Sequence, residues 1–356
     1  MVFELDNLVR ENIRRLVPYS SARGEFSDAA EVWLDANENS FGSPIERDFN
    51  RYPDPLQIAI KENLAEFAGV TTDEIFVGNG SDEAIDLIFR VFCRPSLDNV
   101  IICPPTYGMY EVSANINDVP IKRVCLTPDF QLDIDAIKRA VAANTKLIFL
   151  CSPNNPTGNL LDKKAILDLA RYFSGILVID EAYIHFSGIE SLVSQIADHR
   201  NLIVLQTFSK AWGLAGLRVG LAFAAKETIS LLNKVKPPYN VSQIAQETVL
   251  SALKNRLKVK EIVESIVAER NELAERLNKF AYVEQVYPSD ANFLLVKTSN
   301  ANEIYRFLIR EKIVVRNRNN VQLCEGCLRI TVGMPKENER LIKALEEYGY
   351  LPANSA

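Results

Sequence analysis

The chain has 356 residues, of which 47% are hydrophobic and 24% are charged. This composition is typical of a globular enzyme with a large core and excludes a disordered chain, which would contain fewer apolar residues. A formal net charge of −6 without a dense basic run argues against nucleic acid as the main partner. The length suits two domains.

The N-terminus and the cysteines indicate a cytoplasmic protein. The first residues lack the basic stretch and apolar run of a signal peptide, and no apolar run approaches a membrane span. Six scattered cysteines suit reduced thiols. Cys324 and Cys327 form a C-x-x-C pair, but two histidines and no second such pair offer too few further ligands for zinc. We therefore expect no metal.

Residues 1–41 mix short helix and loop signals and are expected to form an N-terminal arm. Over residues 42–240, short apolar runs alternate with helical patterns such as Glu83–Phe92 and Lys163–Tyr172. Continuous apolar strands between helices predict an α/β domain with a mainly parallel sheet covered on both faces. The seven predicted strands are Ile75–Val77, Val100–Cys103, Ile121–Cys125, Lys146–Leu150, Ile176–Ile179, Leu202–Leu205 and Val219–Phe223.

A smaller α+β domain is predicted for residues 241–356. Pro237 and Pro238 interrupt the chain before it. A long helical stretch then covers about Ser242–Phe280, with a bend or break near Asn255. The other predicted elements are a strand at Asn292–Val296, a helix near Asn302–Glu311, strands near Ile313–Arg316 and Leu328–Val332, and a helix near Glu337–Tyr348.

A carboxylate follows the apolar strand Ile176–Ile179, at the strand end where ligands collect in an α/β sheet. This residue is Asp180, and Tyr183 offers a phenol three positions later. Burying the charge is costly unless it meets a cation. Asp180 is therefore either a helix cap or structural ion-pair member, or the partner of a bound cationic group.

A lysine follows the apolar strand Leu202–Leu205, after the hydroxyl-bearing residues Thr207 and Ser209. Taken alone, Lys210 fits a surface lysine whose stem packs on the sheet. Desolvation, however, lowers the pKa of an amine and makes it a nucleophile toward a carbonyl.

Three other turns carry polar or aromatic groups beside strand ends. Asn155 lies in a stiff Pro- and Gly-containing turn, and the ring of Tyr107 is placed to stack on a flat cofactor. The turn before the helix at Glu83–Phe92 offers backbone N–H groups to a phosphate, at Gly80, Ser81 and Asp82. Each feature alone also fits an ordinary loop, helix cap or core tyrosine.

Together, these residues supply what pyridoxal 5′-phosphate needs from a protein. They offer an amine for its aldehyde, a carboxylate for its pyridine nitrogen, donors for its ring oxygen, a stacking ring and a phosphate cradle that includes Arg218. One cofactor explains the set better than five coincidences.

Three sequence blocks identify the family. Asn155-Pro-Thr-Gly158, Asp180-Glu-Ala-Tyr183 and Ser209-Lys210 with Gly216-Leu-Arg218 resemble the fold-type I pyridoxal-phosphate aminotransferases, over nearly the whole chain. Within that group, further blocks resemble histidinol-phosphate aminotransferases: Leu16–Tyr19, Asp35–Asn39, Arg51–Pro53, Pro104–Tyr110 and Cys327–Gly333. Ser40 departs from the family, which usually has proline there.

The resemblance implies a role for each candidate residue. Lys210 would form a Schiff base with the cofactor and move the substrate proton, and Asp180 would keep the pyridine nitrogen protonated. Asn155 and Tyr183 would bind the ring oxygen and Tyr107 would stack on the ring. The cofactor phosphate would be held by Gly80, Ser81, Asp82, Thr207, Ser209, Arg218 and, from the neighbouring subunit of a homodimer, Tyr52.

The resemblance also implies the substrates, histidinol phosphate with 2-oxoglutarate, giving imidazole-acetol phosphate and glutamate in histidine biosynthesis. Substrate binding would involve Tyr19, Asn37, Arg316 and Arg329; Arg318, two residues after Arg316, leaves the phosphate ligand open. The arm would pack on the small domain and on the partner subunit. Alternatives are an aromatic or broad-range aminotransferase, a threonine-phosphate decarboxylase, and a non-catalytic regulatory module, for which the chain has no evident DNA-binding extension.

Overall fold

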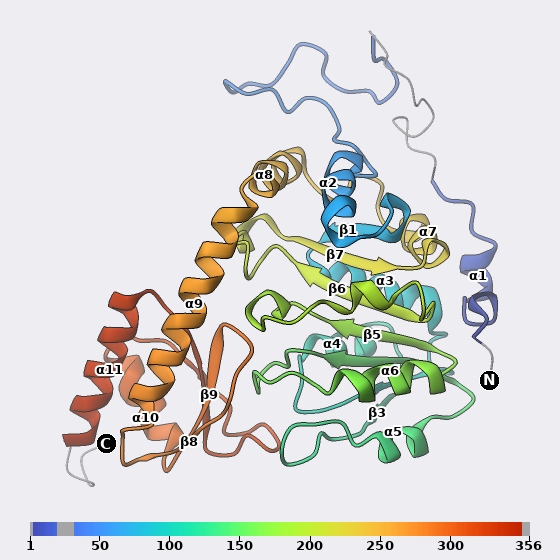
Figure 1. The fold of residues 1–356 in the computed structure, drawn as a ribbon. Coiled ribbons are helices and arrows are strands. Elements are labelled where there is room, and N and C mark those ends of the chain that lie inside the picture. The colour runs from blue at the N-terminus through green and yellow to red at the C-terminus, as the bar shows by residue number, and fades with distance from the viewer. Residues whose placement is uncertain (1–2, 20–31, 351–356) are drawn as a thin grey trace.

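The computed structural model describes residues 3–19 and 32–350, which build two units on separate sheets (Figure 1). The larger sheet has the strand order β1-β7-β6-β5-β4-β2-β3. Neighbours from β3 to β6 are parallel, whereas β7 is antiparallel to β6 and β1. Its strands are β1 Ile75–Asn79, β2 Asn99–Ile102, β3 Ile121–Arg123, β4 Thr145–Cys151, β5 Ile176–Asp180, β6 Leu202–Thr207 and β7 Val219–Ala224. The predicted mainly parallel, seven-stranded α/β fold is confirmed.

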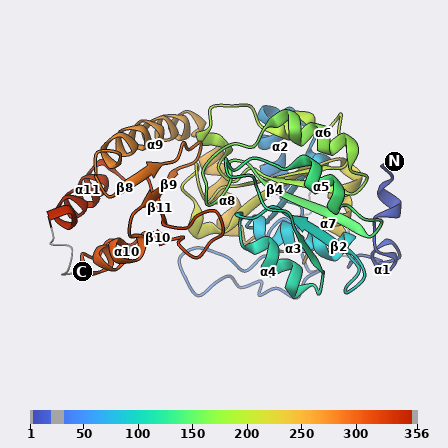
Figure 2. The ribbon, with the colours of Figure 1, turned by 90° about the horizontal axis from the view of Figure 1, so that it is seen from below.

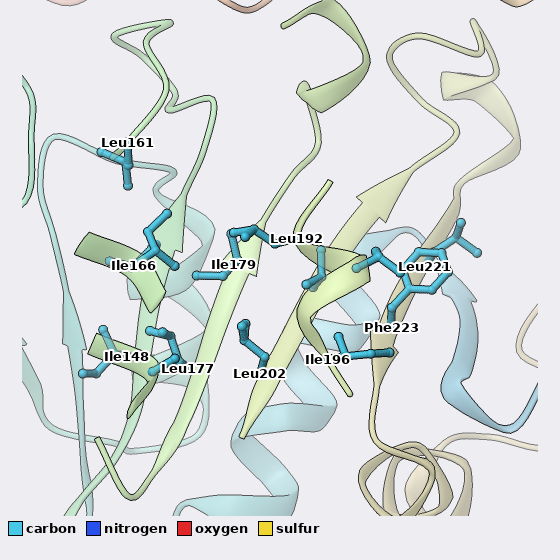
Figure 3. Packing of buried hydrophobic residues seen from close by; sticks show 14 of the residues in the cluster. Ile148, Leu161, Ile166, Leu177, Ile179, Leu192, Ile196, Leu202, Leu221 and Phe223 are labelled. Carbon is cyan, nitrogen blue, oxygen red and sulfur yellow. The ribbon is translucent and has the colours of Figure 1, made fainter. Parts of the chain in front are cut away.

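Helices cover both faces of this sheet because its central strands are apolar on both sides. Alternate residues point to opposite faces, so Leu177 and Ile179 of β5 join one core while Ile176 and Val178 join the other. Figure 3 shows the first core, where Leu177 and Ile179 pack near Ile166 of the helix above them.

Each core has its own set of helices, and Figure 2 shows the two layers on either side of the sheet. The first is covered by α2 Ile58–Ala68, α5 Ile134–Ala140, α6 Lys163–Tyr172 and α8 Gln243–Leu253. The second is covered by α1 Glu11–Arg14, α3 Ser81–Phe92, α4 Met109–Ile116 and α7 Lys226–Val235. None of these helices, nor any other within residues 3–19 and 32–350, is long and apolar enough to cross a membrane.

The smaller sheet is antiparallel, with the order β10-β11-β9-β8. One face packs on three helices through Leu294, Val296, Leu328 and Ile330. The long helical stretch is broken near Asn255, as predicted: its first helix ends at Leu253, and Asn255 immediately precedes the second. The elements are α9 Arg256–Leu277, β8 Val283–Val286, β9 Phe293–Thr298, α10 Ala301–Arg310, β10 Arg316–Asn317, β11 Cys327–Thr331 and α11 Pro335–Tyr350.

Two details of the smaller unit differ from the prediction. The strand expected at Ile313–Arg316 is shorter and later, at Arg316–Asn317, and β8 was not predicted. Neither has a continuous buried run: β8 is a partly exposed edge strand and Arg316 is exposed. Apolar periodicity, the signal used for strands, is absent from such segments.

The first part of the arm, residues 3–13, packs on the large sheet. Ile13 is buried in the second core, and Phe3, Leu5 and Leu8 pack against it. The Arg10 N–H donates to the Val91 carbonyl at 3.0 Å. These apolar side chains therefore extend the second core of the large sheet.

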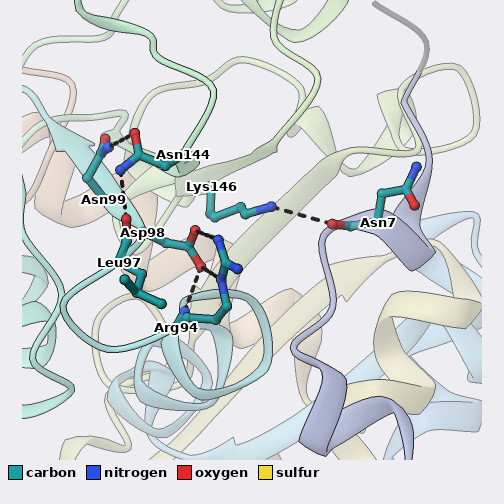
Figure 4. Close-up of polar contacts among 7 residues, drawn as sticks. All are labelled: Asn7, Arg94, Leu97, Asp98, Asn99, Asn144 and Lys146. Atoms are coloured by element: carbon teal, nitrogen blue, oxygen red, sulfur yellow. Dashed lines mark hydrogen bonds and ion pairs between the residues drawn. The ribbon is translucent and has the colours of Figure 1, made fainter.

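The amino end of the large sheet is closed by polar side chains that satisfy one another (Figure 4). Asp98 accepts hydrogen bonds from the side chain of Arg94 at 2.8 and 2.9 Å and from its backbone N–H at 2.8 Å. The amide of Asn99 donates to Asn144 at 2.9 Å, and Asn144 donates to the Leu97 carbonyl at 2.7 Å. This network joins the starts of β2 and β4.

Candidate active site

Ten of the predicted site residues line one pocket of about 510 Å³ at the carboxyl ends of β4, β5 and β6. Parallel strands bring their carboxyl ends to the same edge, which is why residues far apart in sequence meet there. The ten are Ser81, Asp82, Tyr107, Asn155, Asp180, Tyr183, Thr207, Ser209, Lys210 and Arg218; Cys151 and Ala182 also line the pocket.

Asp180 is buried at the end of β5, and no cation forms an ion pair with it within the part of the chain that the structure describes. Its carboxylate accepts hydrogen bonds from the Tyr110 hydroxyl at 2.7 Å and from the Ala182 N–H at 3.1 Å. Burial raises the pKa of Asp180 to about 6, although these hydrogen bonds oppose the shift. Asp180 thus has hydrogen-bond donors but no cationic partner among the described residues, and its role as the partner of a bound cationic group stays a prediction.

Tyr110 is a residue that the sequence reasoning missed as part of the site. It is fully buried, and its ring stacks on Phe149 with centroids 4.9 Å apart and meets Tyr107 edge-on at 5.5 Å. Alternation along β5 turns Asp180 toward the face where α4 carries Tyr110. Its place in a Tyr-Gly-Met-Tyr block beside a strand end was the available signal.

Lys210 lies in the turn after β6, where Ser209 N–H donates to the Thr207 hydroxyl at 3.1 Å. Its ammonium is 5.6 Å from the centroid of the Tyr183 ring. Burial, and next the charge of Arg329, lower the pKa of Lys210, while Asp180 acts in the opposite direction. The neutral amine is the form that attacks a carbonyl, and a pKa lowered by desolvation increases the fraction of lysine in that form.

Asn155 connects the two units at the pocket. Its amide nitrogen lies 3.5 Å from the Tyr183 hydroxyl, and its oxygen accepts a hydrogen bond from Arg329 of β11. The guanidinium of Arg329 also lies 5.2 Å above the Phe293 ring. A side chain of the smaller sheet thus reaches the edge of the larger one.

The start of α3 packs closely against Arg218 and β7, and Ser81, Asp82 and Arg218 line the pocket. Gly80 has φ 76°, and a Cβ there would lie 2.8 Å from the Arg218 guanidinium. A Cβ on Gly220 would lie only 2.1 Å from the Ser81 nitrogen. Arg218 pairs with Asp82 at 3.2 Å, and Tyr107 donates to the same carboxylate at 3.1 Å. Free N–H groups at a helix start beside an arginine suit a phosphate.

Arg316 and Arg329 face each other across β10 and β11. Directly opposite residues of an antiparallel pair project on the same side of the sheet. That side also carries Leu295, which packs into the core of the larger unit. The two predicted substrate arginines therefore share the face turned toward the pocket.

Three predicted residues lie away from this pocket within one chain. Tyr19 is 79% exposed, and Tyr52 stacks on Tyr239 with ring centroids 4.3 Å apart. Asn37 and Tyr52 line a different surface pocket.

Cys324 and Cys327 are buried free thiols. Burial raises the pKa of both, to about 12 and about 11. Among the residues described, no three histidine, cysteine, aspartate or glutamate side chains gather as a metal site requires.

Known proteins are similar to this chain in sequence and in architecture. The family model for aminotransferase class I and II matches residues 22–345. A histidinol-phosphate aminotransferase of Cytophaga hutchinsonii is 50% identical, covering 98% of this chain and 100% of the relative. One from Parabacteroides distasonis is 52% identical, covering 96% and 98%.

A solved structure agrees. Histidinol-phosphate aminotransferase from Sinorhizobium meliloti, in complex with pyridoxal-5′-phosphate, has a TM-score of 0.79 and 25% identity, covering 88% of this chain and 89% of that one. The chain belongs to the class I and II aminotransferase family, among the histidinol-phosphate aminotransferases.

Proposed function

We propose that the chain is a pyridoxal-phosphate-dependent aminotransferase that interconverts histidinol phosphate and 2-oxoglutarate with imidazole-acetol phosphate and glutamate. The observation that carries the chemistry is that one pocket contains both the desolvated Lys210 amine and the buried Asp180 carboxylate. The substrate assignment is supported by relatives about half identical over nearly the full chain.

The residues present fit the cofactor. Glycines at positions 80 and 220 let the start of α3 pack directly against Arg218 and β7, because a Cβ at either position would collide with Arg218 or with the Ser81 backbone. The N–H groups of the helix start are thereby held beside the Arg218 guanidinium, as a phosphate requires. Asp180 has a hydrogen-bond donor on each oxygen but no cation within the described residues. A phosphate at the helix start and a protonated pyridine nitrogen beside Asp180 would complete both sites.

Pyridoxal phosphate supplies an aldehyde that accepts the amino group and an aromatic ring that withdraws electrons from the substrate α-carbon. The Lys210 amine would hold the aldehyde end of the cofactor and would move the proton at the substrate α-carbon. Asp180 would hold the proton on the pyridine nitrogen, Asn155 and Tyr183 would bind the ring oxygen, and Tyr107 would contact the ring. The phosphate would be bound by Thr207, Ser209, Arg218 and the amides of Gly80, Ser81 and Asp82.

Arg316 and Arg329 bind the anionic end of each substrate. A guanidinium can bind either a phosphate or a carboxylate in a bidentate arrangement. One pair of arginines can therefore serve the phosphate of histidinol phosphate in one half-reaction and carboxylates of glutamate and 2-oxoglutarate in the other.

The active enzyme is a cytoplasmic homodimer in this proposal. Tyr52, Tyr19 and Asn37 lie outside the pocket of their own chain, and Tyr19 and Tyr52 are exposed. Tyr52 completes the cofactor site of the neighbouring subunit, and Tyr19 and Asn37 contribute to its substrate site. The division into an arm (1–41), a large domain (42–240) and a small domain (241–356) belongs to the same proposal.

The test is a spectral titration of the holoenzyme with histidinol phosphate, phenylalanine, tyrosine and glutamate. We expect histidinol phosphate to convert the cofactor absorption band at a much lower concentration than either aromatic amino acid. Equal conversion by phenylalanine would assign an aromatic aminotransferase instead. Release of CO2 without a 2-oxo acid would assign a decarboxylase.

A further inference from the structure

A third arginine lies beside the two that face the pocket. The N–H of Arg318 donates to the Cys327 carbonyl at 2.9 Å, which continues the ladder formed by Arg316 with Arg329 and Asn317 with Leu328. Because strand residues alternate between faces, Arg318 projects on the same side as Arg316. Three guanidinium groups therefore share one face of the β10–β11 pair.

These arginines have no anionic partner among the residues that the structure describes. Within residues 3–19 and 32–350, none of the three forms an ion pair with a carboxylate. The Nε atoms of Arg318 and Arg329 are buried without a hydrogen-bond partner. Buried polar groups are normally paired, so an orphaned N–H on each of two neighbouring guanidiniums marks a place for an acceptor.

The three charges also act on one another and on the pocket. Burial and then the charge of Arg316 lower the pKa of Arg318, while Tyr183, a lining residue of the cofactor pocket, acts in the opposite direction. Burial and the charges of Arg318 and Arg316 lower the pKa of Arg329, while Tyr183 acts in the opposite direction. Like charges held together without a counter-ion repel, and a bound anion removes that repulsion.

The loop that carries Arg318 is fixed to the larger unit. Cys324 is buried in the first core of the large sheet, with Val321 and Leu323 packed against that core. Gln322 accepts a hydrogen bond from Cys125 beyond β3 at 3.3 Å. The guanidinium therefore starts from an anchored backbone, and little of its position has to be ordered when an anion binds.

We propose that Arg318 is a third anion ligand, which makes the substrate site selective for a phosphate monoester dianion over a carboxylate monoanion. This inference rests on the proposed function and deepens it. Two arginines balance a dianion in charge, but a phosphate offers three terminal oxygens as acceptors. A carboxylate has two oxygens and one charge, so it is satisfied by Arg329 with one neighbour.

The kinetic test compares Arg318→Gln with the wild-type holoenzyme. We expect kcat/KM for histidinol phosphate to fall roughly 10- to 100-fold, the effect of losing a hydrogen bond to a charged group. For glutamate we expect a fall of roughly threefold or less, and Arg318→Lys should restore part of the loss. Arg306→Gln, an exposed arginine on α10, is the matched control and should leave both substrates unchanged.

A second measurement uses inorganic phosphate and thermal unfolding of the holoenzyme, in which the cofactor phosphate site is filled. Phosphate should raise the melting temperature of the wild type and of Arg306→Gln, and do so much less for Arg318→Gln. Without phosphate, Arg318→Gln should melt no lower than the wild type, because a repulsive charge has been removed; a purely structural arginine would lower it.

The outcomes separate this inference from the proposed function. Equal losses on histidinol phosphate and glutamate, or an unchanged phosphate effect in Arg318→Gln, would overturn the role of Arg318. A wild-type enzyme that ignores histidinol phosphate, but whose phosphate-induced stabilisation depends on Arg318, would overturn the proposed substrate and support the anion site.

Discussion

The two ends of the large sheet treat polar side chains in opposite ways. At the amino end, Asp98 receives three hydrogen bonds from Arg94, and the amides of Asn99 and Asn144 bind each other and nearby backbone. At the carboxyl end, Asp180 has hydrogen-bond donors but no cation among the described residues, and the Nε of Arg329 has no acceptor. The polar groups at the amino end pair with one another, whereas Asp180 and Arg329 at the pocket keep unpaired charge or an unpaired N–H among the described residues.

The difference separates stability from function. Removing one partner of a buried ion pair is destabilising, whereas a buried charge without a counter-ion costs stability until something binds. Asp98 and Asp180 are both aspartates buried beside strand ends, yet their environments give them opposite pKa shifts. Substitutions at the two ends should therefore change activity and stability in different combinations.

Replacing Lys210 by alanine should have the largest effect. Without the amine, neither the bond to the cofactor aldehyde nor the proton movement at the substrate α-carbon is available, so turnover should fall roughly 10⁴-fold or more. Steady-state kinetics measure the loss. Borohydride reduction followed by peptide mass analysis should find a pyridoxyl group on residue 210 of the wild type; its absence there would remove the basis of the mechanism.

Asp180→Asn should have the next largest effect, lowering kcat/KM roughly 100- to 1000-fold, because the charge that holds the pyridine nitrogen protonated is lost. Asp82→Asn is the matched control: its carboxylate also lines the pocket but pairs with Arg218. It should be much milder. Equal, small losses in the two variants would refute the pyridinium role of Asp180.

The cofactor region could be predicted from sequence because its signals are local. An apolar run fixes a strand, and the parallel arrangement brings the strand ends together, so Asp180 and Lys210 were found without knowledge of their neighbours. Tyr110 was not assigned a role, since its contact with Asp180 depends on the position of α4 over β5. The Tyr-Gly-Met-Tyr block places Tyr110 beside a strand end but does not show that its hydroxyl contacts Asp180.

The arrangement of Arg316 and Arg318 was harder to predict, because it too depends on contacts that are not local in the sequence. Arg316 and Arg318 lie on a segment with only two strand residues and no apolar period. Sequence places them two positions apart but does not show that Arg318 continues the ladder to Cys327. The packing of the arm's first residues on the large sheet likewise depends on which apolar surface is left uncovered.

The pH dependence of stability should differ in sign between the two aspartates in the cofactor-free protein. Burial raises the Asp180 pKa from 3.8 to about 6, so the folded state holds the proton more tightly than the unfolded chain. Ionisation of Asp180 therefore lowers the free energy of unfolding as pH rises from about 4 to about 6. Asp180→Asn lacks this ionisable group, so its free energy of unfolding should rise by about 3 kcal/mol relative to the wild type across that range.

At Asp98, burial raises the pKa, but the hydrogen bonds from Arg94 outweigh it and the net pKa lies below 3.8. Its stabilisation is present above pH 3.8 and is lost as pH falls through the folded-state pKa. Asp98→Asn should therefore cost about 2 kcal/mol at pH 7 and progressively less in acid, with normal kcat/KM. Urea unfolding at several pH values measures both variants; slopes of the same sign would contradict the contrast.

Tyr110→Phe should have a smaller effect on activity than Lys210→Ala or Asp180→Asn, and it tests how the carboxyl end of the sheet keeps Asp180 in place. The change removes one hydrogen bond of 2.7 Å to the Asp180 carboxylate and keeps the ring against Phe149. Loss of that donor should raise the Asp180 pKa further and lower kcat/KM roughly tenfold at neutral pH. If Tyr110 acts through Asp180, the acid limb of the pH–rate profile should move to higher pH, and the double variant with Asp180→Asn should be no worse than Asp180→Asn alone. A tenfold loss with an unshifted profile would mean that Tyr110 contributes packing only.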